Sequence, residues 1–420
     1  MVAWILYRII NIIASAKNYL FCSLQNITIL FNIMTMKSYD VIIIGAGAAG
    51  LSAAGELCAR GQQVLVLDMG NAPARKVAAS GGGKCNITNM ATGVTRYFGE
   101  NPNFVRGALS RISPSNILEW CAKHNLKLYE KEPGRYFCTN GADAVVSALM
   151  HDAAGADIKY NHTVTSVIKD ADKFTVLTNG AKFYAGALIV ATGGTSFGAL
   201  GVSDTGQKIA KSFGHKIVPI RPALCAMAVP IFGADLAGIS IDVEILIGRE
   251  KICDAMLFTH FGLGGPAIYR ASVRDFSDGI TINICPKVDI FNALKQAKKN
   301  NGKRNISNVL SEYMPLRVAR YFAQNDTRNI ADYKDTEIQE IAQRINKLYI
   351  AAKDIKLHNL QSAEVVRGGI STHEISSKTM ESKLCSGLFF AGEVIDIAGD
   401  LGGFNLQWAW ASGRVAGQNA

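Results

Sequence analysis

The sequence predicts an α/β fold with a parallel sheet, interrupted by a second part that is rich in β-strands. Three observations lead to this prediction. Short apolar runs near the N-terminus end in glycine turns, which is typical of strands buried on both faces of a parallel sheet. Many short β-like runs follow at about 215–290, and a charged helical stretch covers 291–350. The pattern of buried strand and glycine turn then returns near residue 388.

The composition is that of a globular protein. The 420 residues suffice for two or three domains. Apolar residues make up 49% and charged residues 19%, which excludes a disordered chain. The 40 glycines against 10 prolines fit an α/β architecture, where tight turns need glycine. The nine cysteines form no CxxC pair, so they favour a reducing compartment over a zinc or disulfide framework, and we expect a cytoplasmic protein.

The formal net charge of +10 allows three interpretations. The first is a solvated basic surface, and the second is a positive field that attracts anionic cofactors or substrates. The third is association with RNA. No run of Lys and Arg is long enough to form a basic stripe, so we expect no nucleic acid partner.

Residues 1–35 differ from the rest because they are apolar and lack acidic residues. Basic and amide residues interrupt them, so no apolar run reaches the roughly 18 residues of a spanning helix. Ala-Ser-Ala at 14–16 resembles a signal-peptide cleavage site, but the charge follows the first apolar residues instead of preceding them. We therefore expect residues 1–36 to lie outside the fold, Met36 to be a natural start, and no stable membrane association.

The first elements of the fold form a βαβ unit around the turn GAGAAG (45–50). This turn matches the dinucleotide-binding fingerprint, because it follows a strand, opens a helix and precedes an acidic residue at the end of the next strand. Gly45 permits the tight turn, Gly47 lets the backbone approach a pyrophosphate, and Gly50 lets helix and strand pack closely. Asp68 is placed to bind the ribose hydroxyls, and the helix N-terminus supplies donors to the phosphates. The predicted contacts with the dinucleotide are Gly45, Gly47, Ala48, Ala49, Gly50 and Asp68. The unit predicts a Rossmann-like domain that binds NAD or FAD.

Two further segments favour FAD over NAD. ALIVATGG (187–194) is a strand that ends in small residues, suited to passing beside a bound nucleotide, with Thr192 and Gly193 as contacts. GLFFAGEVID (387–396) precedes a pair of glycines that opens the last helix. Backbone N–H groups at 403–406 are suited to stabilise the negative charge that the N1–C2=O edge of a flavin gains on reduction. A second helix N-terminus of this kind is of little use to a simple NAD dehydrogenase.

The loop SGGGKCNITN (80–89) lies on the ligand side of the predicted sheet. Its glycines let the backbone approach a flat or charged ligand, its lysine supplies a cation, and its asparagines supply amides. Cys85 suits either a thiolate nucleophile or a small packing residue, and packing is favoured because no partner histidine is identifiable nearby. The predicted ligand contacts in the loop are Ser80, Gly81, Gly82, Lys84, Cys85, Asn86 and Asn89.

The chain resembles the BaiN-like/aminoacetone oxidase family of FAD-dependent oxidoreductases in the segments YDVIIIGAGAAG, ARKVAASGGGKCNITN, LFTHFGLGGPAI, TMESK and GLFFAGEVIDIAGDLGGFNLQWAWASG. The resemblance covers nearly everything from residue 37 to 420. It implies an FAD-binding domain at 37–200 plus 356–420, interrupted by an insert at 201–355. We expect the insert to be β-barrel-like at about 201–290, with a helical appendage at about 291–350.

The resemblance also implies which residues lie near the FAD. These are Gly45, Gly47, Gly50, Asp68, Lys76, Gly82, Cys85, Asn86, Gly392, Glu393, Asp396, Gly403, Asn405 and Gln407. Gly402 and Leu406, at the start of the last helix, complete the predicted FAD contacts.

The chain departs from the family pattern at several of these motifs. Lys84 replaces a common Arg, which keeps the charge but loses the bidentate fork, and Asp68 is a shortened Glu. Ala74 replaces a Gly, Phe404 replaces a Tyr, and Gly264 replaces a Ser of the insert, so no hydroxyl role transfers there. FAD binding remains the expectation, but the substrate does not follow from the motifs.

We expect a flavin enzyme that transfers a hydride between flavin N5 and a small organic substrate. No second G-x-G-x-x-G follows a strand, so the sequence predicts no dedicated NAD(P)H domain. Either NAD(P)H visits as a transient donor, or the substrate reduces the flavin and oxygen or a carrier reoxidises it. His260 is the candidate for proton transfer and His373 the second, although a structural role is commoner for either. Arg135 and Arg367 are candidates to bind an anionic substrate.

Two alternative functions remain open at this point. One is a membrane-linked flavin dehydrogenase that passes electrons to a quinone, with residues 1–35 as its anchor. The other is a flavin-binding module associated with RNA, motivated by the net charge. We prefer a soluble oxidoreductase that is a monomer or a weak dimer and acts on a small molecule.

Overall fold

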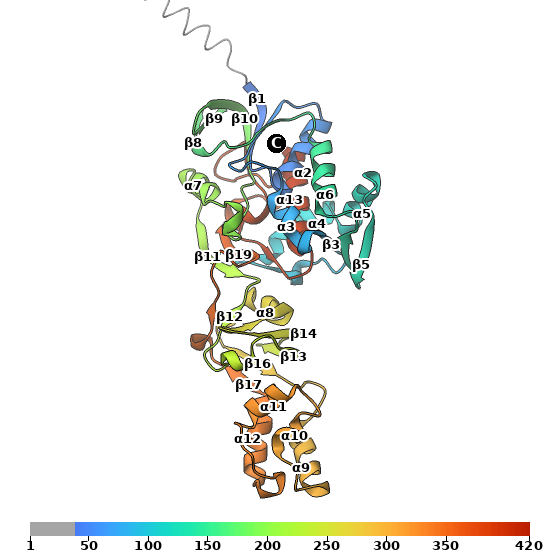
Figure 1. The fold of residues 1–420 in the computed structure, drawn as a ribbon. Coiled ribbons are helices and arrows are strands. Elements are labelled where there is room, and N and C mark those ends of the chain that lie inside the picture. The colour runs from blue at the N-terminus through green and yellow to red at the C-terminus, as the bar shows by residue number, and fades with distance from the viewer. Residues whose placement is uncertain (1–37) are drawn as a thin grey trace, which may run out of the picture.

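The computed structural model describes residues 38–420, so the expectations on residues 1–36 lie outside the described residues. The fold combines a mixed α/β part with an antiparallel β part, and a group of helices lies at the far end of the latter (Figure 1). Between residues 38 and 420, no helix combines the length and the apolar character that crossing a bilayer requires.

The sheet of the α/β part has seven strands in the order β7-β2-β1-β10-β9-β8, and β20 also pairs with β10. Strands β7, β2, β1, β10 and β20 run parallel, whereas β9 and β8 continue the sheet as antiparallel neighbours. The central strands are apolar on both faces because helices and loops cover them, as the buried stretch 41–44 shows. The strands are β1 (Ser38–Ile44), β2 (Val64–Leu67), β7 (Asp157–Lys159), β8 (Val164–Asp170), β9 (Lys173–Thr178), β10 (Lys182–Val190) and β20 (Leu388–Phe390).

The helix after the first strand, α2, packs closely against the last helix of the chain, α13. Glycines make this approach possible. A Cβ at Gly413 would lie 2.2 Å from the carbonyl oxygen of Ala49, and one at Gly417 would lie 2.5 Å from that of Ala53. The two helices whose N-termini the sequence assigns to the cofactor are therefore side by side. The helices of this part are α2 (Ala48–Ala59), α3 (Arg75–Ala79), α4 (Arg106–Arg111), α5 (Pro114–Lys123), α6 (Ala142–Asp152), α7 (Thr205–Ser212) and α13 (Phe404–Asn419).

Three small sheets complete the α/β part and its junction with the insert. One is three-stranded in the order β3-β6-β5, and two are antiparallel pairs, β21-β4 and β11-β19. The β11-β19 pair lies between the two parts of the molecule (Figure 1). The strands are β3 (Asn86–Asn89), β4 (Tyr97–Phe98), β5 (Leu128–Glu132), β6 (Arg135–Cys138), β11 (Ile217–Ala223), β19 (Val365–Ile370) and β21 (Ala398–Gly399).

The second part contains a seven-stranded antiparallel sheet in the order β17-β16-β13-β14-β15-β12-β18. Its buried side chains form a cluster of their own, which also includes apolar residues of the helices at the far end. The predicted domain boundaries at 200/201 and 355/356 stay a prediction. The strands are β12 (Met227–Ala228), β13 (Ser240–Ile247), β14 (Glu250–Thr259), β15 (Gly262–Gly264), β16 (Ile280–Asn283), β17 (Leu348–Ile350) and β18 (Lys356–Leu357). The helices are α8 (Gly265–Ser272), α9 (Ile290–Asn300), α10 (Ile306–Leu310), α11 (Leu316–Phe322) and α12 (Asp335–Asn346).

Candidate cofactor site

A cavity of about 440 Å³ lies between the carboxyl ends of the parallel strands and the N-termini of α2 and α13. Such a crevice is where open α/β sheets bind their ligands. The lining comes from segments far apart in the chain, within 44–49, 67–82, 162–164, 191–205, 364–365 and 391–409, with Asn86, Arg135 and Leu224.

The glycine turn before α2 has the shape that a pyrophosphate requires. Gly45 has a φ of +110°, and a Cβ there would lie 2.4 Å from the carbonyl oxygen of Ala191. A Cβ at Gly50 would lie 1.8 Å from the carbonyl oxygen of Gly45, so this glycine sets the close packing of helix on turn. Gly47 lines the cavity at the N-cap of α2, with no side-chain cap and nothing within 4 Å of its missing Cβ. A side chain there would enter the space beside the free backbone N–H groups, so the turn fits a dinucleotide.

Backbone N–H groups fix the carboxylate of Asp68. One carboxylate oxygen accepts a hydrogen bond from the Ala46 N–H at 2.7 Å, and the other accepts one from the Gly70 N–H at 2.7 Å. Arg75 lies 3.6 Å away. An ionised carboxylate has about four lone-pair sites, so these two backbone bonds leave acceptor capacity for ribose hydroxyls.

The glycine loop forms η1 (Ser80–Gly83), in which three successive glycines have positive φ angles of 59°, 64° and 82°. Side chains rarely adopt this conformation, which explains the glycine run. Gly82 lines the cavity and has nothing within 4 Å of its missing Cβ. Cys85 is fully buried, and burial raises the pKa of its thiol to about 12. This pKa disfavours a thiolate and supports the packing interpretation of Cys85.

The glycine loop is tied to the start of the last helix. Asn89 Nδ2 donates a hydrogen bond to the carbonyl oxygen of Gly402 at 2.9 Å. With the Asn86 amide oriented to satisfy its neighbours, its oxygen accepts from the Gly403 N–H at 3.0 Å and from Arg135 Nε at 3.1 Å. Thus the two segments that the sequence assigned to the flavin, 80–89 and 402–406, meet at one wall of the cavity.

Two predicted site residues, Gln407 and Asp396, lie outside the cavity lining and form buried hydrogen bonds. Gln407 is fully buried, accepts a hydrogen bond from Thr88 Oγ1 at 2.6 Å and donates one to the carbonyl oxygen of Ile112 at 2.8 Å. Asp396 is 1% exposed, and its oxygens accept from the Gly368 N–H at 3.0 Å and the Glu100 N–H at 2.7 Å. Burial raises the pKa of Asp396, against the lowering effect of these two backbone N–H groups.

Most of the predicted contacts line the cavity. They are Gly45, Gly47, Ala48, Ala49, Asp68, Lys76, Ser80, Gly81, Gly82, Asn86, Thr192, Gly193, Gly392, Glu393, Gly402, Gly403, Asn405 and Leu406. The others, which lie outside its lining, are Gly50, Lys84, Cys85, Asn89, Asp396 and Gln407. His260 also lies outside it, exposed in the turn between β14 and β15. The role of each residue toward FAD or substrate stays a prediction.

Sequence reasoning missed three ionisable cavity residues, Arg75, His162 and Glu364, and the last of them directly precedes β19. Glu364 is an exposed residue, but the protein atoms around its carboxyl partly desolvate it, and this desolvation raises its pKa. Arg135 also lines the cavity and acts in the opposite direction on that pKa. No local motif marks Glu364, because only the return of the chain from the insert brings it to the cavity.

A glycine turn at one helix N-terminus, and a second helix N-terminus on the same cavity, define a dinucleotide-binding oxidoreductase of the flavoprotein class. The family model described as "HI0933-like protein Rossmann domain" matches residues 39–419. The chain therefore belongs to the HI0933-like family of BaiN/aminoacetone oxidase-like FAD-dependent oxidoreductases. This finding confirms the predicted family, the α/β Rossmann fold class, the enzyme class and FAD as cofactor.

Three curated relatives match the chain over most of its length. The "Ribosomal RNA dihydrouridine synthase" of Escherichia coli is 33% identical over 398 residues, which cover 91% of this chain and 98% of that protein. The protein of the same name from Haemophilus influenzae is 35% identical, over 90% of this chain and 97% of that protein. The "3-dehydro-bile acid delta(4,6)-reductase" of Clostridium scindens is 28% identical, over 90% of this chain and 98% of that protein.

Proposed function

We propose that this chain is a reductase that saturates a carbon–carbon double bond conjugated with a carbonyl group, and that its substrate is a uracil base in ribosomal RNA. The names of the relatives support this chemistry. Dihydrouridine is uridine whose 5,6 double bond is saturated, and that bond is conjugated with the C4 carbonyl. The third name likewise describes reduction of double bonds in a molecule with a 3-oxo group. In both cases a hydride adds to one carbon of the double bond and a proton adds to the other.

The observation that carries the proposal is the presence of Glu364 and Arg135 in the cavity that both helix N-termini face. When bound, FAD supplies the hydride from N5. Because desolvation raises its pKa, Glu364 is suited to hold a proton and to deliver it to the ring carbon next to the carbonyl. Arg135 offers donors to the carbonyl oxygen, where negative charge develops during the reduction.

A surface next to the cavity supports an RNA substrate. Tyr129 is half-buried and stacks on the buried Phe137 ring in the β3-β6-β5 sheet, with 5.6 Å between the ring centroids, and cations flank the pair. Lys84 Nζ lies 5.8 Å from the Tyr129 ring, and Arg135 lies 5.1 Å from the Phe137 ring. Lys84 and Arg135 are suited to contact phosphates, and the accessible part of the Tyr129 ring is suited to stack with a base, so this combination suits a single-stranded nucleic acid. The proposal therefore replaces the expectation that the chain has no nucleic acid partner.

The proposal also specifies the redox partner. A reductase needs a source of two electrons, so NAD(P)H is proposed as the transient donor, in preference to oxygen as an acceptor. The membrane-linked alternative relied on residues 1–35, which lie outside the described residues. We propose a cytoplasmic location, where both ribosomal RNA and NAD(P)H are present.

The test uses the purified, FAD-loaded chain with NADPH or NADH. Ribosomal RNA transcribed in vitro, free uridine and a steroid 4-en-3-one are supplied in parallel reactions. Dihydrouridine is measured by mass spectrometry of nucleoside digests, and its formation in the RNA supports the proposal. Reduction of the steroid alone overturns the RNA substrate but keeps the conjugated-bond chemistry. If no substrate is reduced while the flavin is bleached by NAD(P)H, the reductase proposal fails.

A further inference from the structure

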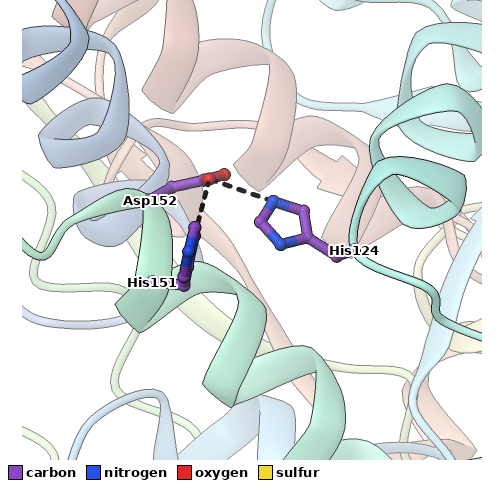
Figure 2. Close-up of side chains that lie close together, drawn as sticks. All are labelled: His124, His151 and Asp152. Atoms are coloured by element: carbon purple, nitrogen blue, oxygen red, sulfur yellow. Dashed lines mark ion pairs between the residues drawn. The ribbon is translucent and has the colours of Figure 1, made fainter.

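A cluster of His124, His151 and Asp152 lies outside the lining of the cofactor cavity. His124 directly follows α5, whereas His151 and Asp152 are the last two residues of α6. Figure 2 shows the carboxylate of Asp152 between the two imidazole rings. The cluster therefore joins the ends of two helices that are neighbours in sequence order but are separated by the β5-β6 hairpin.

The three side chains present one potential ligand atom each to a common point. His124 Nε2 lies 3.0 Å from Asp152 Oδ1, and His151 Nδ1 lies 3.8 Å from the same oxygen. All three ligand atoms lie within 4.8 Å of one another. A tetrahedral zinc ion with bonds of about 2.0–2.1 Å separates its ligand atoms by about 3.3 Å, a value between the two measured distances.

An ordinary ion pair does not account for His124. Its side chain is only 9% exposed, and its Nε2 is buried with no hydrogen-bond partner. The 3.0 Å contact with Asp152 Oδ1 is thus a close approach that lacks the alignment of an N–H···O hydrogen bond. Nε2 thus has an ion-pair partner but no hydrogen bond, and a metal ion would use its lone pair.

The surroundings favour a bound cation. Asp152 Oδ2 accepts a hydrogen bond from Trp120 Nε1 at 2.6 Å, which fixes the carboxylate and leaves Oδ1 toward the histidines. Outer partners of this kind orient the ligands of metal sites. Both α5 and α6 end at the cluster, and the C-terminal ends of helices carry partial negative charge. Arg414, on α13, also interacts electrostatically with Asp152, and its positive charge acts against a bound cation.

We propose that His124, His151 and Asp152 form a binding site for a divalent transition-metal ion of the zinc class. Two imidazoles and one carboxylate suit zinc better than magnesium or calcium, which prefer oxygen ligands. The ion completes its coordination with water, because His151 is 79% exposed. By joining α5 to α6, the ion holds together two helices of the α/β part, and α6 packs against α2 of the cofactor site. This inference does not depend on the proposed function.

The test measures binding of zinc chloride alone to the untagged, full-length, FAD-loaded protein after treatment with a chelator. Isothermal titration is expected to show one site per chain, and His151→Ala is expected to weaken binding at least about 100-fold, since removal of even an outer partner costs 10–100-fold. His151 is exposed, so this variant is expected to fold normally. His373→Ala, which removes an exposed histidine far from the cluster in sequence, is the matched control and is expected to bind like the wild type.

Two further measurements separate a specific site from loose association. Zinc is expected to raise the melting temperature of the wild type and of His373→Ala but not of His151→Ala, because a ligand of the native state stabilises that state. Cobalt(II) in place of zinc is expected to give the visible absorption of a low-coordinate site only when His151 is present. Equal zinc affinity of the wild type and His151→Ala would overturn the proposal. Stoichiometric zinc binding that is lost when the cysteine thiols are blocked would also overturn it.

Discussion

Lys76 Nζ donates a hydrogen bond to Glu393 Oε2 at 2.8 Å, across 317 residues of sequence. Lys76 also donates to Ser196 Oγ at 2.9 Å. Glu393 accepts further bonds from the Gly194 N–H at 3.3 Å and the Val366 N–H at 3.0 Å. The Glu393 carboxylate therefore links its own segment to three others, which contain Lys76, Gly194 and Val366.

This arrangement predicts that Glu393→Gln weakens FAD binding. The amide of Gln keeps one acceptor but presents an NH₂ group to N–H donors, so at least one donor loses its acceptor, and the Lys76 ammonium loses its counter-charge. We expect the dissociation constant for FAD to rise about tenfold or more, which corresponds to about 1.4 kcal/mol. Flavin fluorescence titration of the apoprotein measures it. Glu381→Gln, a carboxylate outside the cavity lining, is the control.

The role of Gly47 in cofactor binding and the role of Gly50 in folding are separable by substitution. Gly47→Val is expected to leave the apoprotein folded, because nothing lies within 4 Å of its missing Cβ and its φ of −84° suits any residue. The same variant is expected to lose FAD, since its side chain occupies the space of the pyrophosphate. Gly50→Val is expected to destabilise the fold itself by about 1–3 kcal/mol or more, because its Cβ would lie 1.8 Å from the Gly45 oxygen. Circular dichroism melting and flavin content distinguish the two. If Gly47→Val retains the flavin, the pyrophosphate does not lie at this turn.

The glycine turn was predictable from sequence because its chemistry is local. The strand, the turn, the helix and Asp68 occupy 30 consecutive residues, and each glycine has a steric reason that follows from the motif alone. The same holds for the glycine loop, whose positive φ angles only glycine adopts easily. By contrast, Glu364 carries no local signal, because its place at the cavity depends on how the insert returns to the α/β part.

Long-range pairing limited the rest of the prediction. The sequence KIVPI (216–220) lies in the β-rich stretch predicted at about 215–290, but β11, which contains most of it, pairs with β19 and not with the seven-stranded antiparallel sheet. Lys76 and Glu393 were both predicted to lie near FAD, yet nothing in the sequence indicates that they contact each other. The cluster of His124 with Asp152 likewise arises from the packing of two helix ends, which periodicity does not reveal.

The raised pKa of Glu364 predicts a pH dependence of the reduction. Its carboxyl is the proposed proton donor, so the active form is the protonated one, which persists to higher pH than for an ordinary glutamic acid. The rate of the chemical step is therefore expected to be constant at low pH and to fall as pH rises through this pKa. Glu364→Gln is expected to reduce the rate by a factor of about 10²–10⁴ and to remove this pH dependence. Single-turnover oxidation of the reduced flavin by the RNA measures both. A Gln variant with the wild-type profile would assign the proton transfer to another group.

The buried His215 predicts that the free energy of unfolding decreases as the pH falls below neutrality. The His215 side chain is fully buried, with Nε2 at 2.7 Å from Ser382 Oγ and Nδ1 at 3.4 Å from Glu374. Burial lowers the pKa of His215, although Glu374 acts in the opposite direction. The unfolded chain, where the pKa is about 6.5, therefore binds a proton first as the pH falls, and the stability that the neutral ring contributes is lost below that pH. In urea unfolding, the difference in stability between wild type and His215→Asn is expected to shrink from pH 7.5 to pH 5.5. A difference that grows would show that Glu374 dominates.

The last prediction concerns Asp400, which is fully buried and joins the cofactor part to the insert. Its oxygens lie 3.1 Å from Arg274, 3.5 Å from Arg270 and 3.2 Å from Arg96. Burial alone would raise the pKa of Asp400, but the hydrogen bonds and charge of Arg274 hold it below its ordinary value. The carboxylate is thus the shared counter-charge of three arginines, of which Arg274 is buried and the other two are partly exposed. It lies two residues before the glycine pair that opens α13.

Asp400→Asn is expected to destabilise the protein by about 3–5 kcal/mol, because the buried Arg274 loses its buried counter-ion and keeps only Glu250, whose side chain is 60% exposed. Asp254→Asn, which removes a partly exposed carboxylate 3.6 Å from Arg270, is expected to cost less than about 1 kcal/mol. Chemical denaturation at pH 7.5 compares the two. Because the pKa of Asp400 is depressed in the folded state, its contribution is present above the unfolded pKa of about 3.9 and is lost only as the pH falls further. The difference between Asp400→Asn and the wild type should therefore stay constant from pH 8 to pH 5. Equal effects of the two substitutions would mean that the three arginines do not depend on Asp400 as their counter-charge.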